Sequence, residues 1–279
     1  MNIKKPLVIL LATASALALS SCFQHETTIR LKKDGSGTLV EENRMSGQML
    51  EMMNQFAGGL GGEDAKPQNP LKDMLSEDKA KERAAELGEG VTLEKIEPVT
   101  VGASKGARAT YHFADINKLR VSTDDSVKQM NKPEGLPGEE KPKTPKKKPI
   151  VFNYKDGVLT IVPNNDKNDE RPGAADKAEA AENLDNPEAM AMMKQMFADM
   201  KVSIKLVAES GIAETNATYR DGDTITLMEM DMNKLMEKPE NLKKFGEIDQ
   251  QNPAAAMEAL KGIDGVKAEV KPEVTVKLK

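Results

Sequence analysis

The stretch TTIRLKKDGSGTLVEENRM, Thr27 to Met45, indicates how this chain folds near its N-terminus. Thr27, Ile29 and Leu31 alternate with polar residues, which is the period of a β-strand with one buried face. The KDGSG segment then supplies an Asp-Gly turn, which tolerates the positive φ angles of a tight hairpin. TLVEENRM returns as the second strand, so the sequence predicts an antiparallel hairpin.

Similar strands and short helices follow along the chain. Hairpins are expected in IVFNYKDGVLTIV and in ETNATYRDGDTITLMEMDMNKLM, each around an Asp-Gly turn. A helix is expected from Glu77 to Leu87, because Ser76 precedes it as an N-cap and Gly88 follows it. The predicted fold class is α+β, with antiparallel β-sheets and flanking helices. Further strands are expected in VTLEKIEPVTV, in GARATYHF, from Val202 to Ala208 and from Val274 to Leu278, and further helices after Ser46 and Asn186.

Two charged stretches divide the predicted domains. NKPEGLPGEEKPKTPKKKP, within residues 121–149, and NNDKNDERPGAADKAEAAE, within residues 163–185, carry few large apolar side chains. Such segments cannot bury enough surface to offset the entropy of ordering, so both are expected to be disordered linkers. The predicted division is a first α+β half at 27–120, a linker at 121–149, a hairpin at 150–162, a linker at 163–185 and a second α+β half at 186–279.

A short motif occurs once in each predicted half. DINKL starts at Asp115 and DMNKL starts at Asp231, and each follows a predicted strand. One interpretation is a pair of equivalent ligand-binding corners. The other, which the capping preference of aspartate favours, is a strand that runs into a one-turn helix with Asp115 or Asp231 as its N-cap. The repetition suggests two related halves that share one sheet or sandwich.

The single cysteine of the chain, Cys22, follows a segment that is typical of secreted proteins. Lys4 and Lys5 precede an apolar run, Leu7 to Leu19, that ends in small residues, as in a signal peptide. A lone cysteine is otherwise a small buried hydrophobe or, in some proteins, a catalytic nucleophile. In bacteria, Leu19-Ser20-Ser21-Cys22 resembles the lipobox of lipoprotein precursors. The resemblance implies a signal peptide at 1–21, a diacylglycerol thioether on Cys22 and a lipidated tether at 22–26.

Lipidation determines where the protein is expected to reside. Two or three acyl chains, at about 0.8 kcal/mol per buried CH₂, hold a protein stably on a membrane, whereas an ordinary signal peptide would leave the mature chain unattached. The sequence has no second long apolar run, so we expect a soluble body tethered to the cell envelope. Phe23 stands where an aspartate would be expected for retention in the inner membrane. The outer membrane is therefore predicted if the source has two membranes.

Composition disfavours several kinds of partner and reaction. The formal net charge is −5, from 40 basic and 45 acidic residues, so nucleic acid is not an expected partner. His25 is placed in the tether and His112 on the polar face of a strand, and both are expected to be ordinary surface residues. We expect no catalytic residue, no metal site and no cofactor, and therefore no enzymatic activity.

Methionine is abundant, with 17 residues in clusters such as MAMMKQM. In the helix predicted after Asn186, Met190, Met193, Phe197 and Met200 fall on one stripe. Such a stripe is either the core-facing side of a helix, where methionine fills irregular gaps, or the lining of an apolar ligand site. Exported proteins also bind copper(I) through thioethers, which is the less favoured interpretation.

Longer segments resemble a family of uncharacterised bacterial lipoproteins. The resemblance lies in VTLEKIEPVTV, GARATYHFADINKL, ESGIAETNATYRDGDTITLMEMDMNKL and PEVTVKLK. More faintly, the lipobox, the DGSG hairpin and SGIAETNATYRDGDTITL are similar to the LppM-type lipoprotein domain. These resemblances imply a lipoprotein of the cell envelope and no particular activity. We expect a non-catalytic interaction or structural module with an envelope protein as partner; the alternative is a carrier of lipids or other apolar small ligands.

Overall fold

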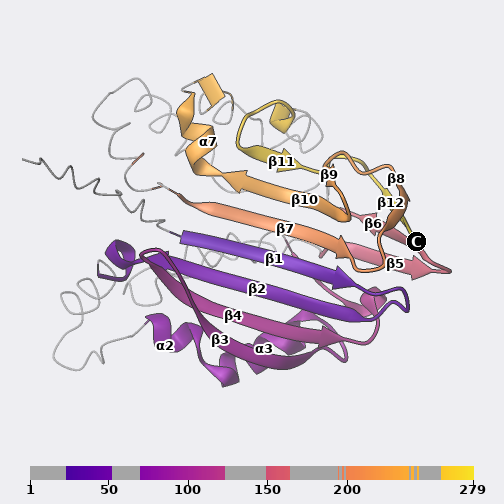
Figure 1. The fold of residues 1–279 in the computed structure, drawn as a ribbon, viewed down its shortest axis with the longest axis horizontal. Helices are drawn as coiled ribbons and strands as arrows, with labels where there is room; N and C mark the ends of the chain where they lie inside the picture. Colours follow the sequence, from indigo (N-terminus) through magenta and orange to yellow (C-terminus); the bar gives the residue numbers. More distant parts are fainter. Residues whose placement is uncertain are drawn as a thin grey trace, which may run out of the picture.

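The computed structural model describes residues 23–51, 70–122, 149–163, 199–238 and 259–279, together with residues 194, 197, 240, 241 and 244. Within these residues the protein consists mostly of β-sheet, and helices are few (Figure 1). The predicted α+β class therefore holds in its coarse form, as antiparallel-rich sheets with some flanking helices. The two predicted linkers and most of the helix predicted after Asn186 lie outside the described residues.

The larger of two sheets has eight strands in the order β11-β10-β7-β1-β2-β4-β3, with β9 beside β10. Its strands alternate in burial along the chain, as a sheet with one core-facing side requires. The bounds are β1 Phe23–Leu31, β2 Gly37–Ser46, β3 Thr92–Val101, β4 Ser104–Phe113, β7 Lys201–Ala208, β9 Arg220–Asp221, β10 Thr224–Asp231 and β11 Val266–Ala268.

Strand β1 lies inside this sheet and joins the two predicted halves. It pairs antiparallel with β2, beginning with Phe23 opposite Met45. On its other side it pairs in parallel with β7, beginning with Gln24 opposite Lys201. The two halves therefore share one sheet. We call the end of the large sheet at which β1 begins the Phe23 end, and we call the opposite end the Leu31 end.

A smaller sheet of four antiparallel strands, in the order β5-β6-β12-β8, packs near the Leu31 end (Figure 1). Strands β5 Val151–Lys155 and β6 Val158–Val162 form the predicted hairpin, and its turn residues Asp156 and Gly157 have φ angles of 51° and 80°. The hairpin is not a separate unit, because β6 pairs with β12 from the C-terminal half. The remaining strands are β8 Ile212–Thr215 and β12 Val274–Leu278.

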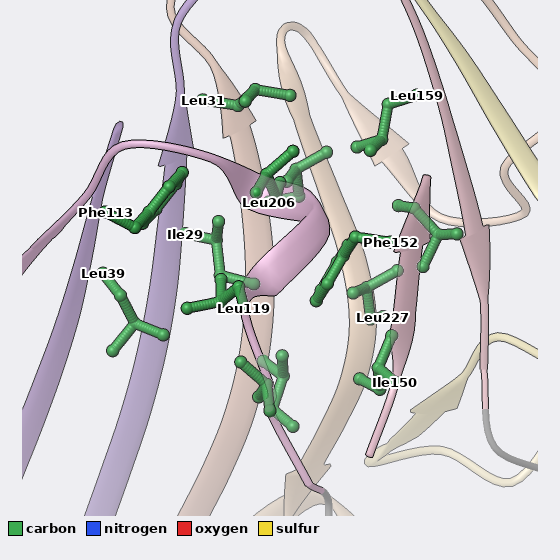
Figure 2. Packing of buried hydrophobic residues seen from close by; sticks show 14 of the residues in the cluster. Ile29, Leu31, Leu39, Phe113, Leu119, Ile150, Phe152, Leu159, Leu206 and Leu227 are labelled. Atoms are coloured by element: carbon green, nitrogen blue, oxygen red, sulfur yellow. The ribbon is translucent and has the colours of Figure 1, made fainter. Parts of the chain in front are cut away.

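One apolar cluster fills the space between the two sheets (Figure 2). Ile29, Leu39 and Leu206 enter it from the large sheet, and Phe152 and Leu159 enter it from the smaller sheet. All of these side chains are 3% exposed or less. Full burial of such a side chain stabilises a fold by about 1.5–3 kcal/mol, so this cluster holds the two sheets together.

Helix α3, Glu77–Leu87, has the bounds that the sequence predicts. The Ser76 side chain accepts a hydrogen bond from the Lys79 backbone N–H at 3.3 Å, and Ala84 and Leu87 are buried in the core cluster. A second cap is formed by Ser46, which accepts from the Met49 N–H at 3.0 Å, where residues 47–51 are helical. The other helices are α2 Pro70–Met74, the 3₁₀ helix η1 Ile116–Lys118 and α7 Met232–Glu237.

Two boundaries predicted from the sequence are wrong. Residues 23–26, assigned to the tether, are paired residues of β1, because their alternation continues the pattern of Ile29 and Leu31 back to Phe23. Val121, assigned to the first linker, is 2% exposed and belongs to the core cluster. It forms an isolated β-bridge with Ile150, so the folded part extends past residue 120.

Candidate functional site

Strand β1 begins at the residue that follows Cys22 in the sequence. Cys22 itself lies outside the described residues. The peptide bond that follows it keeps its Cα about 3.8 Å from that of Phe23, which is 6% exposed and paired with Met45. A lipid on Cys22 would therefore be joined to the folded body with no linker between them.

Among the described residues at this end, the β3–β4 turn carries an exposed large apolar side chain. Val101, the last residue of β3, has 52% of its surface exposed, and Gly102 and Ala103 are exposed as well. Gly102 has a φ of 58°, a conformation that suits glycine in a tight turn. Phe23, the first residue of β1, lies opposite Met45 of β2. Ser104, the first residue of β4, lies opposite the next residue of β2, Ser46, so the β3–β4 turn projects past the start of β1.

His25 lies inside the protein and not on its surface, contrary to the prediction. It is 2% exposed because it points to the same side of β1 as Ile29. Its Nδ1 lies 2.5 Å from Asn43 Oδ1, and its Nε2 lies 3.1 Å from Thr27 Oγ1. The ring nitrogens therefore contact Asn43 on the neighbouring strand β2 and Thr27 on β1 itself. His112 is exposed on β4, as predicted.

A buried ion pair joins the large sheet to helix α3. Glu41 of β2 is 3% exposed and accepts hydrogen bonds from two N–H groups of Arg83. Nη2 donates to Oε1 at 2.9 Å, and Nε lies 3.2 Å from Oε1 and 3.3 Å from Oε2. Burial, reinforced by the negative charge of Glu41, raises the pKa of the neighbouring Tyr111 phenol well above its ordinary value. The pair is fork-shaped and almost closed to water, so it fixes the position of α3 on the sheet.

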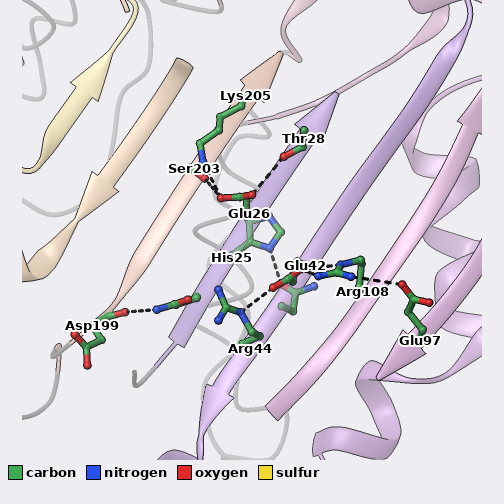
Figure 3. A network of polar contacts seen from close by, with 12 residues as sticks. His25, Glu26, Thr28, Glu42, Arg44, Glu97, Arg108, Asp199, Ser203 and Lys205 are labelled. Carbon is green, nitrogen blue, oxygen red and sulfur yellow. Dashed lines mark hydrogen bonds and ion pairs between the residues drawn. The ribbon is translucent and has the colours of Figure 1, made fainter. Parts of the chain in front are cut away.

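Charged side chains form a ladder across the opposite, outer face of the large sheet (Figure 3). Glu26 of β1 accepts hydrogen bonds from Lys205 at 2.8 Å and from Ser203 at 3.3 Å, both on β7. Burial raises the pKa of Glu26, but the hydrogen bond and charge of Lys205 outweigh it, so the pKa lies below the ordinary value. These bonds tie the two halves together across their parallel junction.

The same ladder continues over the first half of the sheet. Arg108 of β4 lies 2.7 Å from Glu42 of β2 and 3.6 Å from Glu97 of β3. The Glu42 carboxylate, through its hydrogen bond and charge, raises the pKa of Arg108 further above its ordinary value. Charges of both signs alternate along this face, and those described here have partners on a neighbouring strand. The ladder is therefore a cross-strand support and no one-signed binding surface.

The aspartate of each motif caps a short helix, a 3₁₀ helix in DINKL and an α-helix in DMNKL. Asp115 caps η1 by accepting from the Asn117 N–H at 3.0 Å, and Asp231 caps α7 by accepting from the Lys234 N–H at 3.3 Å. The asparagine of each motif binds a neighbouring segment. Asn117 accepts from the Tyr154 N–H at 2.5 Å and donates to its carbonyl at 3.3 Å, which occupies the outer edge of β5.

The second copy holds the start of β7 in the same way. Asn233 accepts from the Asp199 N–H at 2.8 Å and donates back to the Asp199 carboxylate. The two copies lie at opposite ends of the large sheet, because β4 ends at the Leu31 end and β10 ends at the Phe23 end. Each aspartate therefore caps a helix at its own end of the sheet, as the capping interpretation predicts.

Only part of the predicted methionine stripe can be placed. Met190 and Met193 lie outside the described residues. Phe197 is partly buried against a small cluster of Leu235, Met236 and Ile263. Met200 is not helical, because the chain turns at Asp199, where φ is 57°, and β7 then begins. Met200 accordingly does not continue the stripe, and its N–H donates to the Phe197 carbonyl at 3.1 Å.

Within the described residues, no three histidine, cysteine, aspartate or glutamate side chains gather closely enough to hold a metal ion. In the same part of the chain, no helix is long and apolar enough to cross a membrane.

Comparisons with known proteins place this chain in no established family. No family model matches the sequence, and no curated protein matches it. Among solved structures, the folded domain of the Mycobacterium tuberculosis LppM protein is similar, with a TM-score of 0.29 and 7% sequence identity. That match covers 76% of this chain and 84% of the LppM domain, and it is a faint resemblance to a lipoprotein domain.

Proposed function

We propose that this protein is a lipid-anchored module of the bacterial cell envelope that acts by contact with other envelope components and without catalysis. The observation that carries the proposal is the position of the first strand. The lipobox-like sequence puts the first mature residue at Cys22, and β1 begins at the next residue, Phe23. The proposed cleavage point, the Ser21–Cys22 bond, therefore lies one residue before the start of β1.

The pairing of β1 supports this boundary. Its first residues are already held on both sides, Phe23 by Met45 and Gln24 by Lys201. Cleavage before Cys22 would keep both of these pairings in the mature protein. A signal peptide whose removal cut into a strand would expose unpaired backbone groups and would weaken the fold.

A role through contact is supported by how the polar side chains are used. The buried ones described here hold two segments together: Glu41 holds α3 through Arg83, and Glu269 accepts from the Thr218 N–H at 2.7 Å and its hydroxyl at 2.8 Å. Groups engaged in this way keep a rigid scaffold in shape. A rigid, membrane-attached scaffold presents strand edges and faces to a partner at the same surface.

Metabolic labelling with a radioactive fatty acid tests the anchor. The unaltered protein should incorporate label and stay with the membranes after a high-salt wash, whereas the Cys22→Ser variant should be unlabelled and soluble. A matched control combines Cys22→Ser with Ser20→Cys, which keeps one thiol but moves it out of the lipobox register. An unaltered protein that takes up no label and washes off the membrane contradicts the proposal. Fractionation of the membranes of a two-membrane host tests the proposed outer-membrane location.

A further inference from the structure

The short distance between Cys22 and the fold limits how the body can stand on a membrane. The headgroup layer on each side of a bilayer is about 5–8 Å thick, given a hydrocarbon core of ~30 Å within a total of ~40–45 Å. One residue of chain spans less than this distance. A body whose buried Phe23 directly follows an acylated residue must therefore keep its Phe23 end within or against the headgroups.

The strand register identifies what else reaches that depth. Phe23 aligns with Met45, and Met45 aligns with Lys105 of β4. The β3–β4 turn lies beyond this row, and each further residue of a strand adds about 3.3 Å along the strand direction. Val101, Gly102 and Ala103 therefore extend past Phe23 on the side where the acyl chains are attached. We call Val101–Ser104 the hairpin tip.

The chemistry of the hairpin tip suits a lipid interface. Val101 is 52% exposed, and the flanking segment PVTVGASKG, Pro98 to Gly106, contains a lysine and no acidic residue. Exposed apolar side chains gain free energy when they enter the acyl boundary, and a lysine near an anionic membrane surface contributes about 1 kcal/mol. Two acidic side chains near this end are engaged, since Asp231 caps α7 and Asp264 pairs with Lys238.

The turns at the opposite end have a different composition. The β1–β2 turn contains Asp34, the β5–β6 turn contains Asp156, and the β9–β10 turn contains Asp223, with Asp221 at the end of β9. Carboxylates at a turn are repelled by anionic headgroups and lose hydration at a bilayer. The β3–β4 turn beside the anchor contains no acidic residue, whereas each of these three segments does, although the β1–β2 turn also carries Lys32 and Lys33. The two ends therefore differ in their carboxylate content.

We propose that the hairpin tip is a second membrane contact, seated in the headgroup layer of the leaflet that holds the acyl chains of Cys22. This rests on the proposed lipid anchor. Two contacts on one sheet end fix the tilt of the body as well as its attachment. The strands then stand steeply on the membrane, and the smaller sheet is held about 30 Å away, the length of the nine-residue β1.

Single-tryptophan reporters test the seating, because the chain contains no tryptophan. Val101→Trp places the reporter at the hairpin tip. Val158→Trp is the matched control, since Val158 is another strand valine, 37% exposed, beside the β5–β6 turn at the far end. Each protein is purified from membranes with its lipid and reconstituted into vesicles of phosphatidylethanolamine and phosphatidylglycerol, part of which carry brominated acyl chains. Ala103→Trp serves as a second tip reporter if the first variant does not fold.

The tip reporters should be quenched about twofold or more by the brominated lipid and emit at shorter wavelength, and the Val158→Trp reporter should not respond. Flotation of the same vesicles tests the lipid anchor separately from the seating of the hairpin tip. Proteins that float with the vesicles but show no quenching at the tip, or equal quenching at both ends, overturn the seating and leave the anchor standing. Proteins that do not float overturn the anchor, and the seating is refuted with it.

Discussion

Removal of the Arg83 charge should cost more stability than any other single change on the ion pairs described here. In Arg83→Met the apolar stem remains, but the Glu41 carboxylate loses the two hydrogen bonds that Arg83 donates. Glu41 is 3% exposed, so water cannot replace the guanidinium. A buried charge stripped of its partner destabilises a protein by about 3–5 kcal/mol.

Removal of the Glu41 charge should destabilise the protein less than removal of the Arg83 charge. In Glu41→Leu, Arg83 keeps the Glu86 carboxylate at 3.1 Å, and its side chain is 16% exposed to water. We therefore expect a loss of about 2–3 kcal/mol, below the range for a fully stranded charge. The double variant Glu41→Leu/Arg83→Met replaces the pair with apolar side chains. Its free energy of unfolding should lie within about 1 kcal/mol of that of the unaltered protein.

Thermal and urea unfolding followed by circular dichroism measure these differences. At about 2–4 °C per kcal/mol for a chain of this size, Arg83→Met should lower the melting temperature by roughly 6–20 °C. Arg108→Met is the matched control, because Arg108 is 41% exposed and its pair with Glu42 should contribute only about 0–1 kcal/mol. If the double variant is as unstable as the sum of the two single variants, the residues do not interact and the reasoning is refuted.

Two further predictions concern Asn117 of the DINKL motif and Glu26 of the charged ladder on the outer face of the large sheet. Asn117→Ala removes both hydrogen bonds to the main chain of Tyr154 and should destabilise the fold by about 1–2 kcal/mol, whereas an unchanged melting temperature would show that β5 needs no edge support. Glu26→Gln should lose stability at pH 7 but little near pH 3. The pKa of Glu26 is lowered in the fold, so its contribution exists above the ordinary glutamate pKa and disappears as the pH falls through the folded-state value. A difference in melting temperature that stays constant with pH contradicts this account.

The local elements could be predicted because their signals are local. The Asp156-Gly157 turn needs two positive φ angles, and the Ser76 cap with Gly88 at the other end delimits α3. The caps at Asp115 and Asp231 have the same origin. Each of these signals lies within a few residues of the structure that it specifies.

The long-range arrangement could not be predicted in this way. The parallel pairing of β1 with β7 joins residues far apart in sequence. No turn or cap residue near either strand indicates that the two strands pair. His25 was misplaced because its neighbours are polar, although Phe23, Thr27 and Ile29 share its side of the strand. The inward position of Glu41 could not be predicted for the same reason, because its buried charge is stabilised by Arg83, which lies on a helix distant in sequence.

The placement of β1 also has a consequence for how the chain reaches its folded state. Its hydrogen bonds on one side are made with β2, a few residues later, but those on the other side wait for β7; Glu26 and Ser203 are 177 residues apart. A chain that is synthesised from its N-terminus therefore passes through a stage in which the middle of the future sheet is an open edge. Long-range pairing of this kind gives a high contact order and slow folding, and it exposes an aggregation-prone strand for longer.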